Sequence, residues 1–110
     1  TVDTYSNVNV LNMMVDNAVE GAKNTAISYK KANGGTVSAV AFAGNNYDQI
    51  IKLDRCSNVV ISGNTSIFTG KLSVLNSKYC IVTGNSMNQV TYTEQNNTNC
   101  ISETNIFAAQ

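Results

Sequence analysis

The sequence has no excess of basic residues, few charges of either sign and no long apolar run. Seven Lys and Arg residues balance seven Asp and Glu residues, and charged residues make up 13% of the 110 positions. Nucleic-acid binding normally needs a basic excess that neutralises phosphates, so this balance argues against a nucleic-acid partner. No apolar stretch approaches the ~20 residues that span a bilayer, so we expect no membrane partner. A disordered chain would be less apolar, and we therefore expect one folded domain over residues 1–110.

Cysteine is also scarce, whereas asparagine is abundant. The three cysteines are odd in number and widely spaced, which argues against both a disulfide framework and a zinc site. Seventeen asparagines accompany many Val, Ile and Thr residues. Val, Ile and Thr fit pleated strands, and Asn tolerates the left-handed backbone of tight turns. The composition therefore predicts an all-β protein with many short strands.

A six-residue motif recurs at intervals of about 20 residues, in segments 40–45, 59–64, 80–85 and 100–105. When the four copies are aligned, three positions form columns of equivalent residues. The first column holds Val40, Val59, Cys80 and Cys100, and the second holds Phe42, Ile61, Val82 and Ser102. The third column holds Asn45, Asn64, Asn85 and Asn105. Alternation along a strand points the first two columns inward. The Asn column then lies where the chain turns, and stacked amides there can bond to one another. Cys80 and Cys100 share a column, which allows either a disulfide or, as we favour, two stacked free thiols.

The same period predicts two further strands in each coil. One set covers residues 25–29, 49–54, 71–75 and 90–94, and short apolar pieces at 14–15, 67–68, 87 and 106–107 supply the other. Three short strands per coil, over about five coils, is the pattern of a parallel β-helix. The coil that contains residues 18–35 is longer than the 20-residue period of the other coils. These residues predict either a helix that ends near Gly34 or, as we favour, a strand at 25–29 followed by a protruding turn at 30–35.

Segments 58–65 and 79–86 resemble the repeat of the right-handed, pectin-lyase-like parallel β-helices. That family includes pectate lyases, polygalacturonases, alginate epimerases and the bacteriophage tailspikes that bind or cleave bacterial surface polysaccharide. The Asn-rich, proline-free coils most resemble part of a phage tailspike or appendage, which implies a virion or otherwise extracellular location. The family's lyases and hydrolases use clustered Asp, a basic residue or a His, and this sequence contains no His.

The candidate site residues lie at the ends of the predicted strands. Asp54 and Glu94 are the weak candidates for a catalytic carboxylate pair, with Leu75 between them in the stack. We expect the outward side chains Lys52, Asp54, Thr91, Thr93 and Glu94 to bind polysaccharide on one flat face. We expect no cofactor and no metal ion. Among the aromatic residues, Phe42 and Tyr92 are predicted in the core, and Tyr47 and Tyr79 are predicted at exposed turns.

An apolar stripe of Ala41, Val60, Ile81 and Ile101 is predicted on the outer side of the motif strands. Contiguous exposed apolar surface usually marks a covered face. The tailspikes of the resembling family are trimers, so we expect a homotrimer through Val60, Ile81 and Ile101. Three functions stay open from the sequence: glycan binding by a tailspike β-helix, which we favour, a polysaccharide-degrading lyase or hydrolase, and a structural shaft without a ligand.

Overall fold

The computed structural model describes residues 1–16, 23–44 and 47–109, and these residues form strands and turns without a helix. The strands are β1 (Val2–Asp3), β2 (Ser6–Leu11), β3 (Met14–Asp16), β4 (Asn24–Lys30), β5 (Asn33–Ser38), β6 (Ala41–Ala43), β7 (Tyr47–Asp54), β8 (Ser57–Ser62), β9 (Thr65–Ser66), β10 (Gly70–Leu75), β11 (Ile81–Thr83), β12 (Val90–Gln95) and β13 (Ile101–Glu103).

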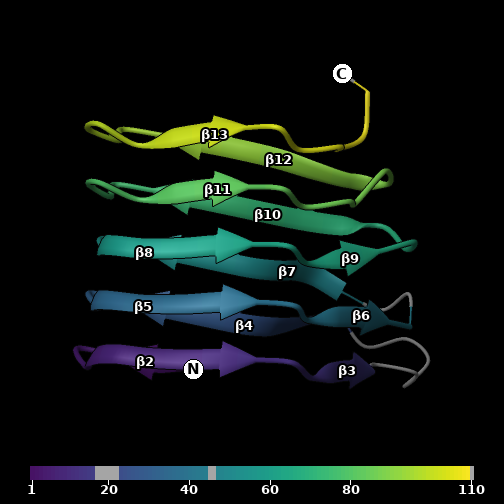
Figure 1. The fold of residues 1–110 in the computed structure, drawn as a ribbon, viewed down its shortest axis with the longest axis horizontal. Helices are drawn as coiled ribbons and strands as arrows, with labels where there is room; N and C mark the ends of the chain where they lie inside the picture. The colour runs from purple at the N-terminus through teal and green to yellow at the C-terminus, as the bar shows by residue number, and fades with distance from the viewer. Residues whose placement is uncertain (17–22, 45–46, 110) are drawn as a thin grey trace.

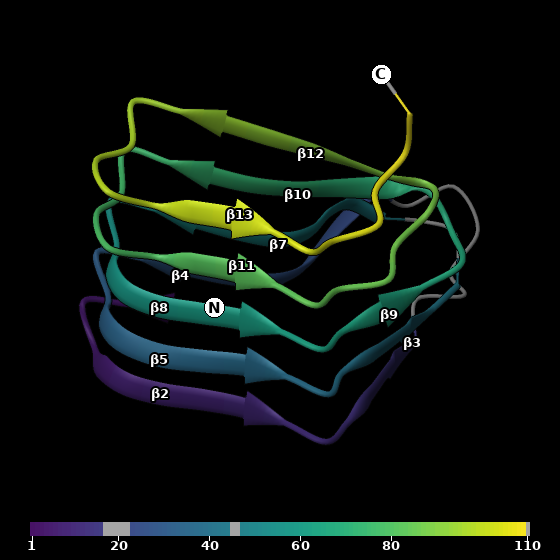
Figure 2. The ribbon, with the colours of Figure 1, turned by 45° about the horizontal axis from the view of Figure 1, so that its top comes forward.

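The strands stack in three parallel sheets that wind as a solenoid (Figures 1 and 2). The first sheet has the order β1-β4-β7-β10-β12, the second sheet β13-β11-β8-β5-β2 and the third sheet β3-β6-β9. In Figure 1 the second sheet runs from left to right in front, and the first sheet returns behind it while the chain rises. The coil is therefore right-handed. The chain makes about four turns, with five strands in each long sheet, which confirms the predicted parallel β-helix with three strands per coil.

The register of the strands stacks similar side chains directly above one another inside the coils. The first sheet aligns Tyr29, Leu53 and Val74 in one inward column. The second sheet aligns a matching inward column of Val37, Ile61 and Val82. All six side chains are buried. Full burial of such an apolar side chain contributes about 1.5–3 kcal/mol relative to exposure, so these columns form the core.

Asparagine side chains form a ladder at the turn between the second and third sheets. Asn64 donates from Nδ2 to Asn85 Oδ1 at 2.9 Å, and Asn85 donates in the same way to Asn105 at 2.9 Å. The second Nδ2 hydrogen of each amide reaches the carbonyl of the inward residue in the coil below, as Asn85 does to Ile61 at 3.1 Å. The predicted interior ladder is confirmed for Asn64, Asn85 and Asn105.

A second polar column lies beneath the corner between the first and second sheets, and the repeat analysis missed it. Ser77 donates its N–H to Asn97 Oδ1 at 2.9 Å, and Cys56 donates its N–H to Ser77 Oγ at 3.1 Å. Asn97 Nδ2 also donates to the Val74 carbonyl at 2.8 Å. This is the bonding pattern of the Asn ladder, but the residue types Cys, Ser and Asn vary, so sequence identity did not reveal it.

Each coil turns at three positions where the backbone is left-handed. One column holds Thr4, Lys31, Arg55, Asn76 and Asn96, a second holds Asn7, Gly34, Asn58, Tyr79 and Asn99, and a third holds Asn12, Ala39, Gly63, Gly84 and Thr104. Asn and Gly are the residues that adopt this conformation at least cost. Their frequency at these positions explains the turn-rich composition.

The predicted motif copy at residues 40–45 is wrong. Thr36 and Val37 pair with Val60 and Ile61, so the preceding copy of the motif lies at residues 35–40, 24 residues before its partner. Val40 stands below Asn64 and donates its N–H to Asn64 Oδ1 at 3.0 Å, which ends the ladder. Asn45 lies outside the described residues.

Phe42 and Ala41 consequently belong to β6 in the third sheet rather than to the motif strands. Phe42 is buried, as predicted, but not beside Ile61. The third sheet also differs from expectation near residue 67, because β9 covers Thr65–Ser66 and Ile67 is exposed.

The long coil holds the predicted strand rather than a helix over its described part. β4 spans Asn24–Lys30, and the expected protruding turn at 30–35 is instead a tight corner that enters β5. Residues 17–22 of this stretch lie outside the described residues. Tyr47 is buried rather than exposed, and its hydroxyl proton is shared between the carbonyl oxygens of Val15 at 2.9 Å and Ala43 at 2.7 Å.

Candidate functional site

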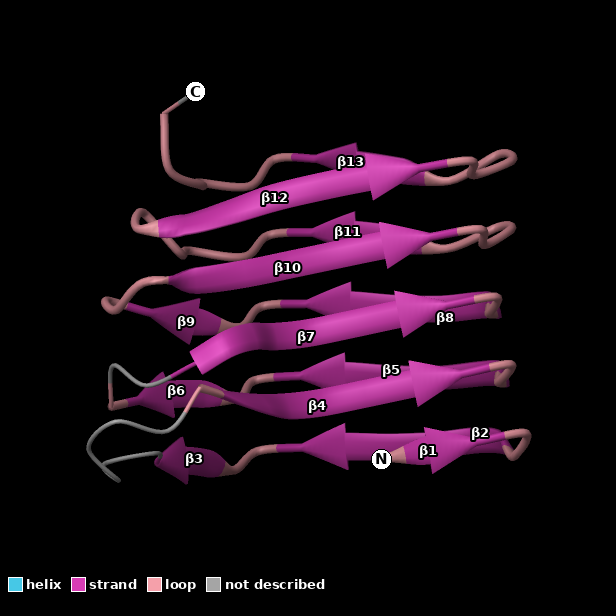
Figure 3. Cartoon of the chain, turned by 180° about the vertical axis from the view of Figure 1, so that it is seen from behind, coloured by secondary structure: helices cyan, strands magenta, loops and turns pink. Residues whose placement is uncertain are grey.

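Four of the five predicted binding residues lie on the outer side of the first sheet, which faces the viewer in Figure 3. We call this surface the polar sheet face. Register places its outward side chains in three columns, which hold Gln49, Lys71 and Thr91, then Ser28, Lys52, Ser73 and Thr93, and finally Lys30, Asp54, Leu75 and Gln95. Successive members of a column are about 4.8 Å apart, since that is the spacing of paired strands.

Glu94 lies on the opposite side of the sheet. It pairs with Val74 in the inward column above Tyr29 and Leu53, whereas Asp54 pairs through Leu75 with Gln95. The predicted stacking of Asp54 and Glu94 is therefore wrong, because one residue of register reverses the face of a side chain. Glu94 accepts a hydrogen bond from the Tyr92 hydroxyl at 3.1 Å.

Glu94 also lines a polar hollow of about 260 Å³ where the chain passes from β12 toward β13. The hollow is bordered by Glu94, Gln95, Asn96, Asn97, Asn99 and Cys100. Tyr92 points inward, as predicted, and stacks on Phe107 with ring centroids 5.0 Å apart. The hollow adjoins the polar sheet face at Gln95.

Hydrogen bonds between coils hold the middle of the polar sheet face in place. Ser73 donates from Oγ to Gln49 Oε1 at 2.9 Å, and its Oγ lies 2.8 Å from Thr93 Oγ1. Ser73 is only 3% exposed although it points outward, because its neighbours cover it. The hydroxyl and amide groups of this face are thus ordered by each other.

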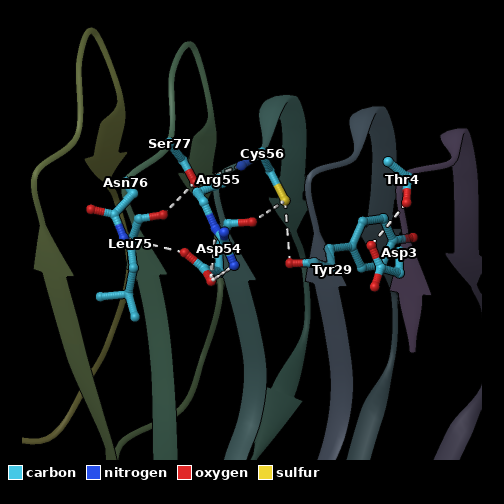
Figure 4. A network of polar contacts seen from close by, with 9 residues as sticks. All are labelled: Asp3, Thr4, Tyr29, Asp54, Arg55, Cys56, Leu75, Asn76 and Ser77. Atoms are coloured by element: carbon cyan, nitrogen blue, oxygen red, sulfur yellow. Dashed lines mark hydrogen bonds and ion pairs between the residues drawn. The ribbon is translucent and has the colours of Figure 1, made fainter.

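At the edge of the polar sheet face, Asp54 is bound by two donors (Figure 4). Arg55 donates from Nε and Nη2 to Asp54 Oδ2 at 3.3 and 3.0 Å, and Asn76 Nδ2 donates to Asp54 Oδ1 at 3.2 Å. Burial alone raises the pKa of Asp54, but the hydrogen bonds from Asn76 and Arg55 and the charges of Arg55 and Lys52 outweigh it. The pKa of Asp54 therefore lies below its ordinary value. A general acid needs the opposite shift, so Asp54 is an anion that orients Arg55.

All three cysteines are free thiols, and two of them, Cys80 and Cys100, stack in one column. Cys80 donates its N–H to Cys100 Sγ at 3.4 Å, which confirms their shared column. Burial raises the pKa of the Cys80 thiol to about 11, so the reactive thiolate is scarce at neutral pH. Within residues 1–16, 23–44 and 47–109, no three His, Cys, Asp or Glu side chains gather as metal ligands. The described chain likewise contains no helix that could span a membrane.

No protein-family model, curated protein or solved structure matches the chain. The functional argument therefore depends on the fold and on the side chains described above. Among these, the polar sheet face brings together outward polar side chains from four strands of the first sheet.

Proposed function

We propose that the polar sheet face binds a polysaccharide of the bacterial surface, and that the chain forms part of a phage tailspike or appendage. Lys52, Asp54, Thr91 and Thr93 supply the polar contacts. The resemblance of the repeat to pectin-lyase-like β-helices and the solenoid fold support this proposal. Glu94 is not among the proposed contacts, since it lies on the opposite side of the first sheet.

The observation that carries the proposal is the Gln49–Ser73–Thr93 hydrogen-bond network across three coils. Groups held in place before binding lose little entropy when a ligand arrives, so each new hydrogen bond contributes more of its energy to affinity. Sugars present many hydroxyl groups to such donors and acceptors. A linear polymer also suits a solenoid, whose surface repeats along one axis.

We further propose that three copies associate through Val60, Ile81 and Ile101 on the outer side of the second sheet. These residues form one column, with Ile81 38% and Ile101 49% exposed. Thr36 takes the place below Val60 that was predicted for Ala41, so the stripe is shorter than expected. We place this trimer in the virion, where it would form a stable spike that displays the glycan-binding surface.

No observation favours the polysaccharide-degrading alternative. Its candidate carboxylates lie on opposite sides of the first sheet, and the lowered pKa of Asp54 does not suit a general acid. We therefore assign binding, and no catalysis, to the polar sheet face.

Glycan binding by the intact oligomer tests the proposal. A bacterial glycan array should identify a bound polysaccharide, and titration should then show affinity falling about 2–10-fold for Thr93→Val and for Lys52→Ala, since each change removes one hydrogen-bonding group. Thr83→Val is the matched control, because Thr83 points outward from the second sheet. Binding that is unaltered in both polar-sheet-face variants would reject this face as the site.

A further inference from the structure

The corner that follows the polar sheet face carries large side chains at backbone positions that favour Asn. In the first left-handed column, Lys31 and Arg55 have φ values of 55° and 54°, where the two coils above have Asn76 and Asn96 at 53° and 56°. A left-handed backbone costs a residue with a Cβ about 1–2 kcal/mol, and short polar side chains such as Asn relieve that cost locally. Lys31 and Arg55 are therefore poor choices for the turn itself.

Tyr79 is a second such exception on the same corner. It has a φ of 56° in the column that holds Asn58 one coil below and Asn99 one coil above. An aromatic side chain has no local hydrogen bond that compensates for the left-handed backbone. Tyr79 is nevertheless 54% exposed, so core packing does not explain it either.

Backbone pairing places Lys31 and Arg55 in adjacent coils. The Lys31 N–H donates to the Asp54 carbonyl, and the Arg55 N–H donates to the Leu75 carbonyl. The two cations thus lie about one strand spacing apart, and like charges at cross-strand positions destabilise a sheet. Arg55 forms the one ion pair of the described residues, with Asp54. Two of its five N–H groups are used there, and the others stay available.

Charge along this corner is unbalanced although the chain is neutral overall. The basic residues Lys30, Lys31, Arg55 and Lys78 outnumber the acidic residues Asp3, Asp54 and Glu94, which leaves a formal charge of 4 − 3 = +1. Asp3 pairs in register with Lys30, and Asp54 is bound to Arg55 and Asn76. Lys31 is exposed at the centre of this group.

We propose that Lys31, Arg55 and Tyr79 form an anion-binding subsite, the corner ridge, which holds an acidic group of the polysaccharide bound by the polar sheet face. This inference rests on the proposed function. The cations bind a carboxylate or sulfate on the sugar, and the exposed Tyr79 ring packs against the sugar ring. Backbone cost and charge repulsion at these positions are the expected signs of residues retained for binding rather than for stability.

Asparagine substitutions test the corner ridge without disturbing the turn, because Asn is the natural residue at the equivalent positions of other coils. The probes are hyaluronate as a carboxylated polymer, heparin as a sulfated polymer and dextran as a neutral one. For the intact protein at low salt, Lys31→Asn/Arg55→Asn should weaken binding to at least one acidic polymer 10-fold or more, and should reduce its salt dependence. Tyr79→Asn should weaken binding without altering the salt dependence. Lys23→Asn is the charge-matched control, since Lys23 is exposed beyond the far end of β4.

Thermal unfolding of the same variants separates binding from structure. Lys31→Asn and Tyr79→Asn should each unfold at the same temperature as the wild type or higher, whereas the double variant also lacks the ion pair between Arg55 and Asp54. A lower unfolding temperature in either single variant, or undiminished binding of the double variant to both acidic polymers, would overturn the inference. Failure of the wild type to bind either acidic polymer would overturn it as well. Binding to a neutral glycan in that case would leave the proposed function standing, whereas absence of all glycan binding would remove both.

Discussion

A single buried amide joins three coils of this protein. Asn85 Oδ1 accepts from the Asn64 N–H at 3.0 Å and from Asn64 Nδ2 at 2.9 Å. Its own Nδ2 donates to Ile61 in the coil below and to Asn105 above. Asn85 is 2% exposed, so water cannot replace these partners. Every polar atom of this side chain is therefore hydrogen-bonded within the protein.

Replacement of Asn85 by Ala should lower the free energy of unfolding by at least about 1–3 kcal/mol, because the Asn64 groups and the Ile61 carbonyl lose their partner. Urea unfolding of the purified variant measures this loss. Asn88→Ala is the control and should stay within about 0.5 kcal/mol, since Asn88 is exposed. Equal effects at the two positions would contradict an interior ladder.

Asp54 should make stability depend on pH on the acid side. Its pKa in the folded chain is lower than in the unfolded chain, so its contribution is complete above the unfolded value of about 3.9 and is lost as pH falls through the folded value. We expect Asp54→Asn to be less stable than wild type at pH 6 and to approach it near pH 2. Thermal unfolding across this range measures the difference, and a difference that is constant with pH would refute the coupling to Arg55 and Asn76.

At the scale of strands and turns, the repeat could be predicted where coil length is constant. Segments 59–64, 80–85 and 100–105 are 20 or 21 residues apart, and their register in the structure follows those offsets. The preceding coil has 24 residues and carries Gly35, Ala39 and Val40 at the motif positions. In that coil, backbone pairing and the hydrogen bond from the Val40 N–H to Asn64 replace the Asn–Asn bond of the later coils. The motif residues are therefore absent there, and the motif was wrongly predicted to begin at residue 40.

Gly35 shows why that coil departs from the motif. A Cβ at Gly35 would lie 2.6 Å from the Val8 carbonyl and 2.9 Å from the Tyr29 ring, and its φ is 138°. The Tyr29 ring passes over Gly35 and donates its hydroxyl to the Val8 carbonyl at 2.5 Å. A large core residue in β4 thus requires the smallest residue in β5, a relation between two strands that no single repeat column displays.

Gly35→Ala should therefore lower the free energy of unfolding by about 1–3 kcal/mol or more through overpacking and backbone strain. Gly63→Asn provides the matched comparison, because Gly63 has a φ of 66° and no atom lies within 4 Å of a Cβ built there. It should be tolerated within about 1 kcal/mol. Urea unfolding of both variants decides, and a tolerated Gly35→Ala would contradict the close approach of Tyr29.

At the scale of the whole molecule, the sequence predicted where the polar sheet face lies, but it did not predict correctly every residue that belongs to it. Alternation along a strand correctly placed Lys52, Asp54, Thr91 and Thr93 outward. Glu94 was predicted on the same face because the last strand residue before the turn was taken as equivalent to Asp54, whereas the residue in register with Asp54 in that coil is Gln95. The corner ridge was missed because backbone conformation, rather than a residue pattern, distinguishes it.

The proposed trimer concerns the opposite side of the coil. Ile81→Lys places a charge in the middle of the exposed Val60–Ile81–Ile101 column and should reduce the solution mass from three chains to one. Asn88→Lys adds the same charge at an exposed site outside the column and should leave the mass unchanged. Light scattering measures both, and a wild type with the mass of one chain would dismiss the trimer.

Stacking of like residues, one per turn, underlies every assignment made for this chain, and proton contacts between asparagine side chains test it most directly. In a nuclear Overhauser spectrum, the account predicts cross-peaks from the side-chain amide of Asn85 to those of both Asn64 and Asn105, and none between Asn64 and Asn105, which are two coils apart. An Asn85 amide with contacts to neither neighbour would contradict the account.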